Sequence, residues 1–422
     1  MSPAAEALAP LRHRAFAWYL ASRTANLLGS TAALVAMAFA VLDVGGSATA
    51  LGQVLAARIL PMTLLLLFGG VVADRLPRAL VLQVSNLSSA ALQGATAVLL
   101  LTGDARLWQL VALQALQGAA SGVGFPAMAG MVPTLVPSSA LQPANALVSM
   151  SRGLTTILGP SLGTLLVVTV GSGWAVLADA ALWGVAALLL LPVRRATPAR
   201  PTPDGPRASP LSELREGWVL FRSTTWLWVV VAAFGVLNAV GSGAWLTLGP
   251  ALAGETIGRA AWGWVLSAEA AGAVVATVVL LRVRLGRPLL VGMPAVALLA
   301  LPLVLLGTVP HTGLLIAAAA LAGAGLEVFG MGWNLAMQEN IEESQLSRAY
   351  SYDALGSMAA VPLGQLAIGP LGDRFGYASV ITVCGVAVGV VALGVLGSRA
   401  VRTLPRRPQP PARPDVVAVD AG

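Results

Sequence analysis

The sequence predicts an all-α polytopic membrane protein of about twelve transmembrane helices, arranged as two six-helix repeats. Three observations predict this fold: the composition, the spacing of apolar segments, and short motifs shared by the two halves of the chain. The 422 residues are 57% hydrophobic and 10% charged, whereas charged residues make up about 25% of a soluble domain. A soluble fold would lack the polar surface to cover so many apolar residues, so we expect lipid to solvate the chain.

Apolar segments long enough to span a bilayer, which takes roughly 20 residues, follow one another along the chain. In the first half they lie at 16–42, 48–73, 79–102, 107–132, 143–169 and 174–193. In the second half they lie at 226–250, 260–282, 288–308, 312–337, 348–370 and 376–397. They predict an N-terminal bundle at 16–193 and a C-terminal bundle at 218–398, preceded by a cytoplasmic N-terminus at 1–15. The Pro- and Arg-rich stretches at 194–217 and 399–422 are predicted to be a cytoplasmic linker and a disordered cytoplasmic tail.

Arginine placement predicts the orientation, because cytoplasmic loops carry an excess of basic residues. With both termini inside, 19 arginines fall on the cytoplasmic side, within 12–14, 75–78, 194–222, 282–287, 348 and 399–413. Only three fall on the other side: Arg106, Arg259 and Arg374. We therefore expect a multi-pass protein of a bacterial plasma (inner) membrane with both termini cytoplasmic. This distribution also explains the basic character of the chain without a nucleic-acid partner.

Short motifs recur between the two halves. NLLGS at 26–30 is echoed by NAVGS at 238–242, and Asp43 and Glu255 follow at the same offset. GVGFP at 122–126 is echoed by GMGWN at 330–334. Parallel six-helix repeats are a common way for secondary transporters to enclose a central cavity between two bundles. The repeats therefore indicate a secondary transporter.

Several kinds of chemistry are excluded by what the sequence lacks. One cysteine, Cys384, and two histidines allow neither an internal disulfide nor a Cys/His metal site. The chain contains no phosphate-binding G-x-x-x-x-G-K-[ST] loop, nucleophile elbow or H-E-x-x-H motif. We expect no metal, no cofactor and no enzymatic activity. The expected partners are a small-molecule substrate, protons and the lipid bilayer, and the expected state is a monomer.

The segment GVVADRLPR at 70–78, between the second and third spans, resembles the G-x-x-x-D-R-x-x-R loop of the major facilitator superfamily. The resemblance implies a conformational latch formed by Gly70, Asp74, Arg75 and Arg78. Asp74 is expected to meet the positive end of the eleventh span, near 347–353, in one conformation only. The alternative is an ordinary basic cytoplasmic loop with an incidental Asp.

Further segments resemble the drug-efflux branch of that superfamily, which includes macrolide and siderophore exporters. They include FPA at 125–127, LVP at 135–137, ANA at 144–146 and GPLGDRFG at 369–376, so the resemblance covers 12–398. GPSLG at 159–163 resembles the Gly-Pro antiporter signature and implies a hinge at Gly159, Pro160 and Gly163. A simple packing kink is the alternative. The resemblance favours export over uptake.

Six charged residues are expected inside or at the edge of the spans, where a charge costs about 2.5–3.5 kcal/mol unless it has a partner, a wet cavity or a function. They are Arg58, Arg152, Asp179, Glu269, Glu327 and Asp353. Two charges that proton-coupled relatives carry are missing here, because Gln114 replaces an arginine of the fourth span and Ser30 an aspartate of the first. Proton coupling through the usual residues is therefore in question.

Two of these charges lead to specific hypotheses. Arg152 and Glu269 are placed at similar depths from opposite sides, which predicts an ion pair that either alternates during transport or is permanently structural. Arg58 and Glu269 occupy equivalent places in the two repeats. Glu327, among glycines of the tenth span, is a candidate for proton binding or for recognising a cationic substrate; the alternative is a capped polar residue between helices.

The predicted substrate cavity combines polar and aromatic residues of the central spans: Asn26, Ser30, Asn238, Trp245, Phe329, Trp333 and Asn334. An apolar cavity with aromatic rings suits a bulky hydrophobic solute. We therefore expect a proton-coupled exporter of hydrophobic or amphipathic small molecules, such as antibiotics, that works by alternating access. The alternatives are a specific carrier of a metabolite, siderophore or lysophospholipid, and a membrane receptor without transport activity.

Overall fold

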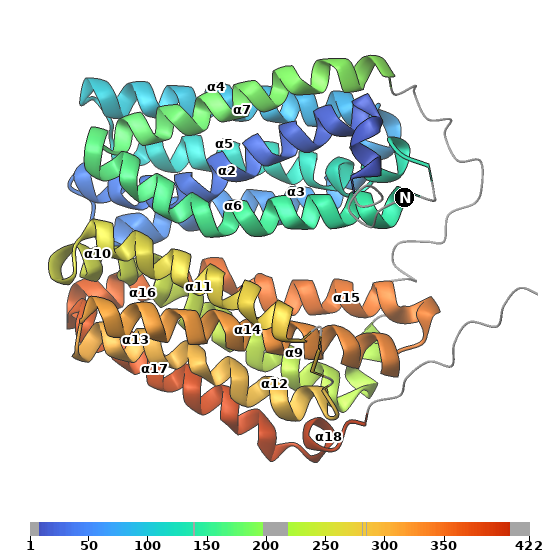
Figure 1. The fold of residues 1–422 in the computed structure, drawn as a ribbon. Helices are drawn as coiled ribbons and strands as arrows, with labels where there is room; N and C mark the ends of the chain where they lie inside the picture. The colour runs from blue at the N-terminus through green and yellow to red at the C-terminus, as the bar shows by residue number, and fades with distance from the viewer. Residues whose placement is uncertain (1–7, 138–139, 197–217, 281, 284, 406–422) are drawn as a thin grey trace, which may run out of the picture.

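The computed structural model describes residues 8–137, 140–196, 218–280, 282–283 and 285–405. The described residues form helices joined by short connections, and none of them lies in a strand. The helices run side by side in two bundles, one from each half of the chain (Figure 1). Most of the predicted linker and tail, 197–217 and 406–422, and residues 1–7 of the N-terminus lie outside the described residues.

The N-terminal bundle follows the six predicted segments closely. After a short 3-10 turn at Ala9–Arg12, its helices are α2 (Arg14–Asp43), α3 (Ala48–Arg75), α4 (Arg78–Thr102), α5 (Leu107–Ala129), α6 (Leu141–Val170) and α7 (Ser172–Ala196). A second 3-10 turn at Val132–Thr134 follows α5. Glycine ends two of these helices: Gly103, in the left-handed conformation, follows α4, and Gly171 follows α6.

The C-terminal bundle contains several interrupted helices. The seventh segment is α9 (Thr225–Leu237) and α10 (Gly243–Thr256), joined by a π-helical turn at Asn238–Ser242. The others are α11 (Arg259–Leu280), α12 (Pro288–Val296) with α13 (Ala300–Thr308), α14 (Thr312–Asn340), α15 (Glu343–Met358) with α16 (Ala360–Phe375), and α17 (Tyr377–Gly394), followed by a short α18 (Arg399–Arg402).

Within the described residues, eleven helical segments are long and apolar enough to cross a membrane. The remaining predicted span forms α5, whose hydropathy is lowered by Gln109, Gln114 and Gln117. Gln114 and Gln117 are turned into the bundle, where they are 1% and 0% exposed. α5 packs along α3 and α4 as one of the six helices of its half, so the prediction of two six-helix repeats is confirmed.

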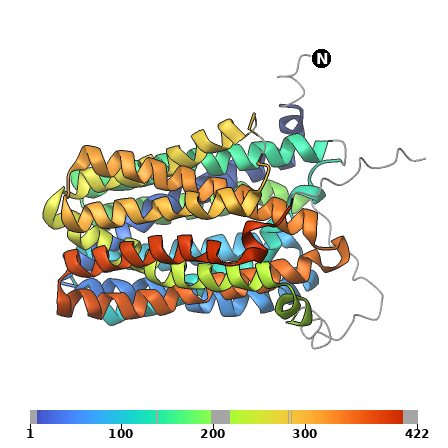
Figure 2. The ribbon, with the colours of Figure 1, turned by 90° about the horizontal axis from the view of Figure 1, so that it is seen from below.

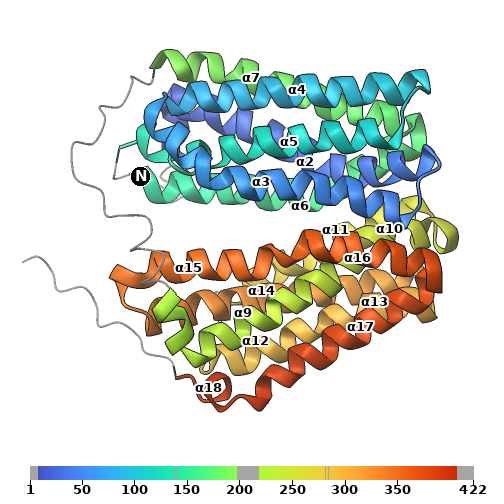
Figure 3. The same ribbon diagram turned by 180° about the vertical axis from the view of Figure 1, so that it is seen from behind.

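The two bundles touch at one end and diverge toward the other. The helix pairs that join them are α3 with α16, α6 with α11, and α10 with α2 and α3. Figures 1 and 3 show the bundles converging near α10 and separating near α15, α18 and the N-terminus. Figure 2 shows the molecule from below, with the helices lying roughly parallel to one another. We call the end near α10 the closed end, and the opposite end, where α2 and α15 begin and α7 ends, the terminal end.

Glycine contacts reveal the internal symmetry of the two halves. Gly52 of α3 packs against the backbone of Gln365 in α16, and Gly263 of α11 packs against Thr164 in α6. Six residues further along each helix lie Arg58 and Glu269 (58 − 52 = 269 − 263). The backbone carbonyl of Arg58 faces Gly118 of α5, and that of Glu269 faces Gly323 of α14. The structure therefore places Arg58 and Glu269 at equivalent positions of the two repeats.

Candidate functional site

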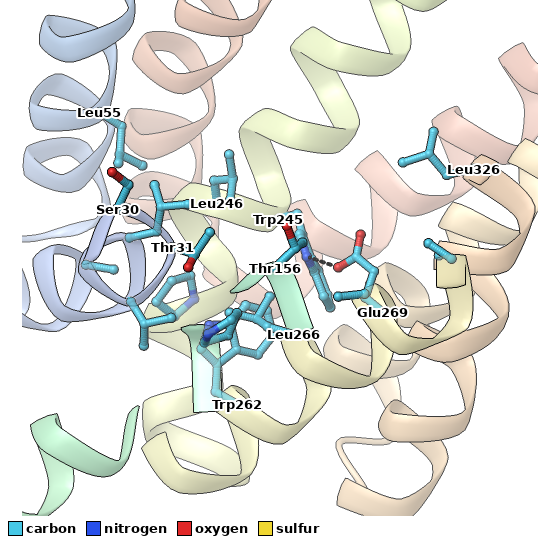
Figure 4. Close-up of a pocket in the computed structure, with 18 of the residues that line it drawn as sticks. Ser30, Thr31, Leu55, Thr156, Trp245, Leu246, Trp262, Leu266, Glu269 and Leu326 are labelled. Carbon is cyan, nitrogen blue, oxygen red and sulfur yellow. Dashed lines mark hydrogen bonds between the residues drawn. The ribbon is translucent and has the colours of Figure 1, made fainter. Parts of the chain in front are cut away.

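A cavity of about 530 Å³ lies between the two halves. Its walls come from α2, α3 and α6 of the N-terminal half and from α10, α11, α14 and α16 of the C-terminal half. In Figure 4, Ser30 and Leu55 lie on one side of this space and Glu269 and Leu326 on the other. The volume falls within the range of small-molecule sites, roughly 300–1,000 Å³. A cavity shared by both halves is the central candidate site of the molecule.

Most of the cavity wall is apolar, with aliphatic side chains from α2, α3, α10 and α11. Two tryptophans, Trp245 and Trp262, stand together in the wall with ring centroids 4.6 Å apart. The π-helical turn that precedes α10 marks a break in the regular helix close to Trp245. Such turns occur frequently at functional sites. The wall therefore offers hydrophobic and aromatic contacts rather than dense hydrogen bonding.

The C-terminal half contributes two carboxylates to the cavity wall, Glu269 and Glu327. Trp245 donates its indole N–H to Oε2 of Glu269 at 3.0 Å, the dashed contact in Figure 4. Thr277 donates its hydroxyl to Oε1 of Glu327 at 3.0 Å. A carboxylate inside a membrane-spanning bundle is costly, so acids in such places usually serve a function. Two of the four acids predicted from the sequence, Glu269 and Glu327, thus face the shared cavity.

Among the described residues, the N-terminal half contributes one charged side chain to the wall, Arg58. Behind it lies Asp179 of α7, only 2% exposed, which interacts electrostatically with Arg58. Gln93 donates to Oδ2 of Asp179 at 2.7 Å, and Gln114 donates to Gln93 at 3.2 Å. Asp179, Gln93 and Gln114 thus form a hydrogen-bonded group inside the N-terminal bundle, next to Arg58.

The sequence named Asp179 and Gln114 but did not reveal that Gln93 connects them. A Cβ atom on Gly29 would lie 2.5 Å from Oδ1 of Asp179, so the glycine of the first span makes room for this carboxylate. Gln114, where relatives carry a charge, is linked through Gln93 to the same carboxylate. Of the two positions that lack the expected charges, Gln114 therefore belongs to the polar group around Asp179, whereas Ser30, the neighbour of Gly29, lines the central cavity.

The predicted Arg152–Glu269 ion pair is absent from this structure. Ser161 and Ser267 share a hydrogen bond of 2.7 Å between α6 and α11. Because these helices are antiparallel, Glu269 lies level with residue 159, seven residues from Arg152, or about 10 Å along the axis. The carboxylate of Glu269 bonds Trp245 instead, and the Arg152 side chain is exposed. A permanent structural pair is therefore wrong, because apolar segment boundaries do not fix the register of two helices.

Asp353 and two predicted cavity aromatics belong to a different place. Trp333 donates its indole N–H to Asp353 at 2.9 Å, between α14 and α15. Phe329 and Trp333 are 5% and 7% exposed and stack with their centroids 6.1 Å apart. Phe234 stacks on Phe329 at 4.2 Å. These rings form part of the C-terminal core rather than the cavity wall, because their helix face turns toward α9.

The other predicted cavity residues divide between four places. Ser30 and Trp245 line the central cavity, and Asn238 lines a smaller adjoining cavity of about 100 Å³ that shares Trp245 and Glu269 with it. Asn26 bonds Asn86 at 3.4 Å within the N-terminal half. Asn334 accepts a bond from the hydroxyl of Tyr350 at 3.1 Å, outside the cavity. Asn26 and Asn334 are therefore absent from the cavity wall in this conformation.

The predicted hinge in α6 is a continuous helix that contains Pro160. A Cβ on Gly159 would collide with the side chain of Thr31, and one on Gly163 with the backbone of Ala32. These glycines allow α6 to pack closely on α2 in the same half. Pro160 itself lines the cavity. The geometry agrees with the packing alternative, and bending at this position stays a prediction.

The predicted latch is described only in part. The side chains of 66–75, which include Gly70, Asp74 and Arg75, and those of 347–348 lie outside the described residues. The fourth member, Arg78, donates a hydrogen bond to the carbonyl of Gly130 at the end of α5, within its own half. The latch between the halves stays a prediction.

The closed end is held by polar contacts that cross between the halves. Arg259 forms a salt bridge of 2.6 Å with Asp43, and its guanidinium lies over the ring of Phe39. Thr49 donates to Asp373 from its hydroxyl at 2.5 Å and from its backbone N–H at 3.1 Å. The sequence marked Asp43 and Arg259 as charges just outside their spans but gave no indication that they would meet.

Comparison with known proteins adds family evidence to this geometry. The sequence model of the Major Facilitator Superfamily matches residues 20–352. The multidrug efflux pump Tap of Mycobacterium tuberculosis (strain ATCC 25618 / H37Rv) is 26% identical over 394 residues, which cover 90% of this chain and 92% of Tap.

Solved structures share the fold at low sequence identity. A crystal structure of a mutant of the nucleoside transporter NupG matches with a TM-score of 0.74 and 12% identity, covering 91% of this chain and 99% of that one. A bacterial homologue of the iron transporter ferroportin, in an inward-facing state, matches with a TM-score of 0.68 and 18% identity, covering 91% and 99%. At these identities the structural likeness concerns the fold alone.

Proposed function

The chain belongs to the Major Facilitator Superfamily, and we propose that it exports bulky hydrophobic or amphipathic small molecules in exchange for protons. Membership of this family makes the protein a multi-pass inner-membrane transporter rather than an enzyme. The direction of transport, the substrate class and the coupling ion are the proposal. So are the monomeric state and the cytoplasmic location of both termini, which the arginine distribution supports.

The central cavity is the observation that carries this proposal. It has the volume of a small-molecule site, is lined mainly by aliphatic and tryptophan side chains, and receives residues from both halves. Hydrophobic binding of this kind tolerates different substrate shapes, because it depends on buried area rather than on fixed hydrogen-bond geometry. The similarity to the multidrug pump Tap along almost the whole chain supports export of several compounds.

The distribution of contacts between the halves supports alternating access. The salt bridge Asp43–Arg259 and the Thr49–Asp373 bonds hold the closed end together. With the termini in the cytoplasm, this arrangement is the inward-facing conformation, ready to take substrate from the cytoplasm or the inner leaflet. Breaking the closed-end contacts and closing the terminal end would then release substrate outside.

Glu269 is the residue best placed to couple protons to this cycle. It faces the cavity, adjoins the smaller cavity of the C-terminal half, and has a tryptophan N–H as its hydrogen-bond partner. Binding of a proton and binding of a substrate at the same carboxylate would exclude each other, which is the basis of exchange. Glu327, bonded to Thr277, is the second candidate on the same wall.

Reconstituted transport tests the proposal directly. Purified protein in proteoliposomes is assayed with a panel of dyes and antibiotics, with and without an imposed pH gradient. We expect gradient-dependent movement of several hydrophobic compounds, and loss of antibiotic accumulation in cells that express the protein. Transport of a single metabolite class would support a specific carrier instead. Absence of flux for every compound would support a receptor without transport activity.

A further inference from the structure

We propose that the cavity is built for zwitterionic amphiphiles, with the cationic group of the substrate at Glu269 and its anionic group at Arg58. This inference rests on the proposed transport function and names the substrate class of the same site. The observation behind it is that the two halves present opposite charges to one shared space. Arg58 is the charged residue of the N-terminal wall, and Glu269 and Glu327 are those of the C-terminal wall.

Arg58 has hydrogen-bonding capacity left for a ligand. Its guanidinium makes no hydrogen bond or ion pair with the described residues, although a guanidinium carries five N–H donors. Asp179 compensates its charge from inside the bundle without lying within salt-bridge distance. Because Arg58 lines the cavity, a charge balanced by Asp179 can stay in the membrane and offer its unused donors to a ligand there. A carboxylate or phosphate group of a substrate is the natural acceptor for these donors.

Glu269 and its surroundings form the opposite pole. Its Oε2 accepts the indole N–H of Trp245, while Oε1 has no hydrogen bond with any part of the chain that the structure describes. The ring of Trp245 lies beside it in the wall, and the ring of Trp262 packs on that of Trp245 with a centroid distance of 4.6 Å. A carboxylate next to aromatic faces binds an amine or quaternary ammonium group through charge attraction and cation–π contact. Glu327 adds a second negative charge to this wall, and no basic side chain of the C-terminal half lines the described cavity.

The apolar wall between Arg58 and Glu269 would contact the part of the substrate that lies between its two charged groups. Leu55, Ile59, Leu246 and Leu266 contribute to it, so the body of the substrate should be hydrophobic. A simple lipophilic cation would leave the Arg58 donors desolvated and unpaired. A simple lipophilic anion would meet the two carboxylates of the opposite wall. Unpaired buried polar groups and like-charge contacts both oppose binding, and only a zwitterion satisfies both walls.

The test compares two dyes of nearly the same size. Rhodamine B carries a cationic ring system and a carboxylate, whereas its ethyl ester keeps the cation and lacks the anionic group. Binding to purified protein in detergent at neutral pH is followed by fluorescence anisotropy, and transport in proteoliposomes. We expect rhodamine B to bind about tenfold more tightly than the ester, because a hydrogen bond to a charged group is worth at least that factor.

Matched variants assign the two poles. The double variant Arg58→Gln/Asp179→Asn removes the positive pole and keeps the bundle neutral, and it should bring the two dyes to similar affinity while ester binding is retained. Glu269→Gln should weaken both dyes about tenfold, because both carry the cation. Glu255→Gln and Arg399→Gln change exposed residues outside the cavity and serve as controls. Elution profile and thermal unfolding show whether each variant is folded.

The outcomes separate this inference from the proposed function. Equal affinity of the wild-type protein for the two dyes, or a preference for the ester, overturns the zwitterion assignment even if both dyes are exported. An unchanged preference in the folded Arg58→Gln/Asp179→Asn variant overturns the role of Arg58. Export of other hydrophobic compounds without binding of either dye leaves the exporter intact and rejects the substrate class. Failure of every compound to move rejects the proposed function itself.

Discussion

Replacing Gly369 by alanine should open the closed end. Gly369 of α16 packs against the start of α3, where a Cβ would lie 2.7 Å from the carbonyl oxygen of Ala48 and from Cα of Thr49. Ordinary van der Waals contact begins at 3.4 Å, so the helices must separate by about 0.7 Å (3.4 − 2.7). Both neighbours are backbone atoms, which cannot turn away as a flexible side chain would.

The added methyl group destabilises only the conformation in which α3 and α16 are in contact, and this free-energy cost sets the size of the population shift. Overpacking of this kind costs about 1–3 kcal/mol. The cost vanishes when α3 and α16 move apart, so it enters the conformational equilibrium directly. A difference of 1–3 kcal/mol corresponds to a population shift of about 5–150-fold. Gly369→Ala should therefore enrich the conformation that is open at the closed end by at least about fivefold.

Distance measurements between spin labels at this end provide the assay. Labels are placed at Asp104→Cys and Val309→Cys, exposed positions beside the closed end of each half, after the buried Cys384 is replaced by alanine. Gly184→Ala is the matched control, because a Cβ there meets no atom within 4 Å. If Gly369→Ala gives the same distance distribution as Gly184→Ala, the assignment of this interface as the moving one is refuted.

Three smaller predictions use other contacts. Asp43→Asn removes the salt bridge to Arg259, in which Asp43 is 34% and Arg259 39% exposed. Because such a half-exposed pair contributes about 0.5–1 kcal/mol, the population that is open at the closed end, measured with the same labels, should rise only about two- to fivefold, and less at high salt. Asp179→Asn weakens the hydrogen bond from Gln93 and leaves Arg58 without its counter-charge, so it should lower the free energy of unfolding by about 1–3 kcal/mol in thermal denaturation; partial recovery in the double variant is required by this reasoning. Arg78→Ala removes a hydrogen bond to the end of α5 and should cost about 1 kcal/mol of stability; a conformational shift without a stability change would speak against this local role.

The helices could be predicted from the sequence because lipid imposes a simple rule on composition. Most predicted spans end within a few residues of the observed helices, as at 288–308 and Pro288–Thr308. The π-helical turn at Asn238–Ser242 could not be predicted, since apolar windows do not report local hydrogen-bond patterns. The equivalence of Arg58 and Glu269 was predictable because the internal repeat fixes relative positions without any knowledge of packing.

The contacts within the site were less predictable. A permanent pairing of Arg152 with Glu269 was wrong because the register between α6 and α11 is set by small residues such as Ser161 and Gly263, not by where apolar segments begin, and a pair that forms only in another conformation stays a prediction. The indole bond to Glu269 and the position of Asp179 behind Arg58 depend on helix rotation. Hydropathy shows which segments span the membrane, but it does not show how each helix is rotated about its own axis.

Transport by the Glu269→Gln variant tests the central claim most directly. Export of a dye is measured in proteoliposomes over a range of imposed pH gradients, with Glu255→Gln as the control of equal charge change. We predict that the wild-type protein and Glu255→Gln respond to the gradient, and that Glu269→Gln does not and moves the dye at least about tenfold more slowly. An unchanged rate and an unchanged response to the gradient in Glu269→Gln would contradict the account.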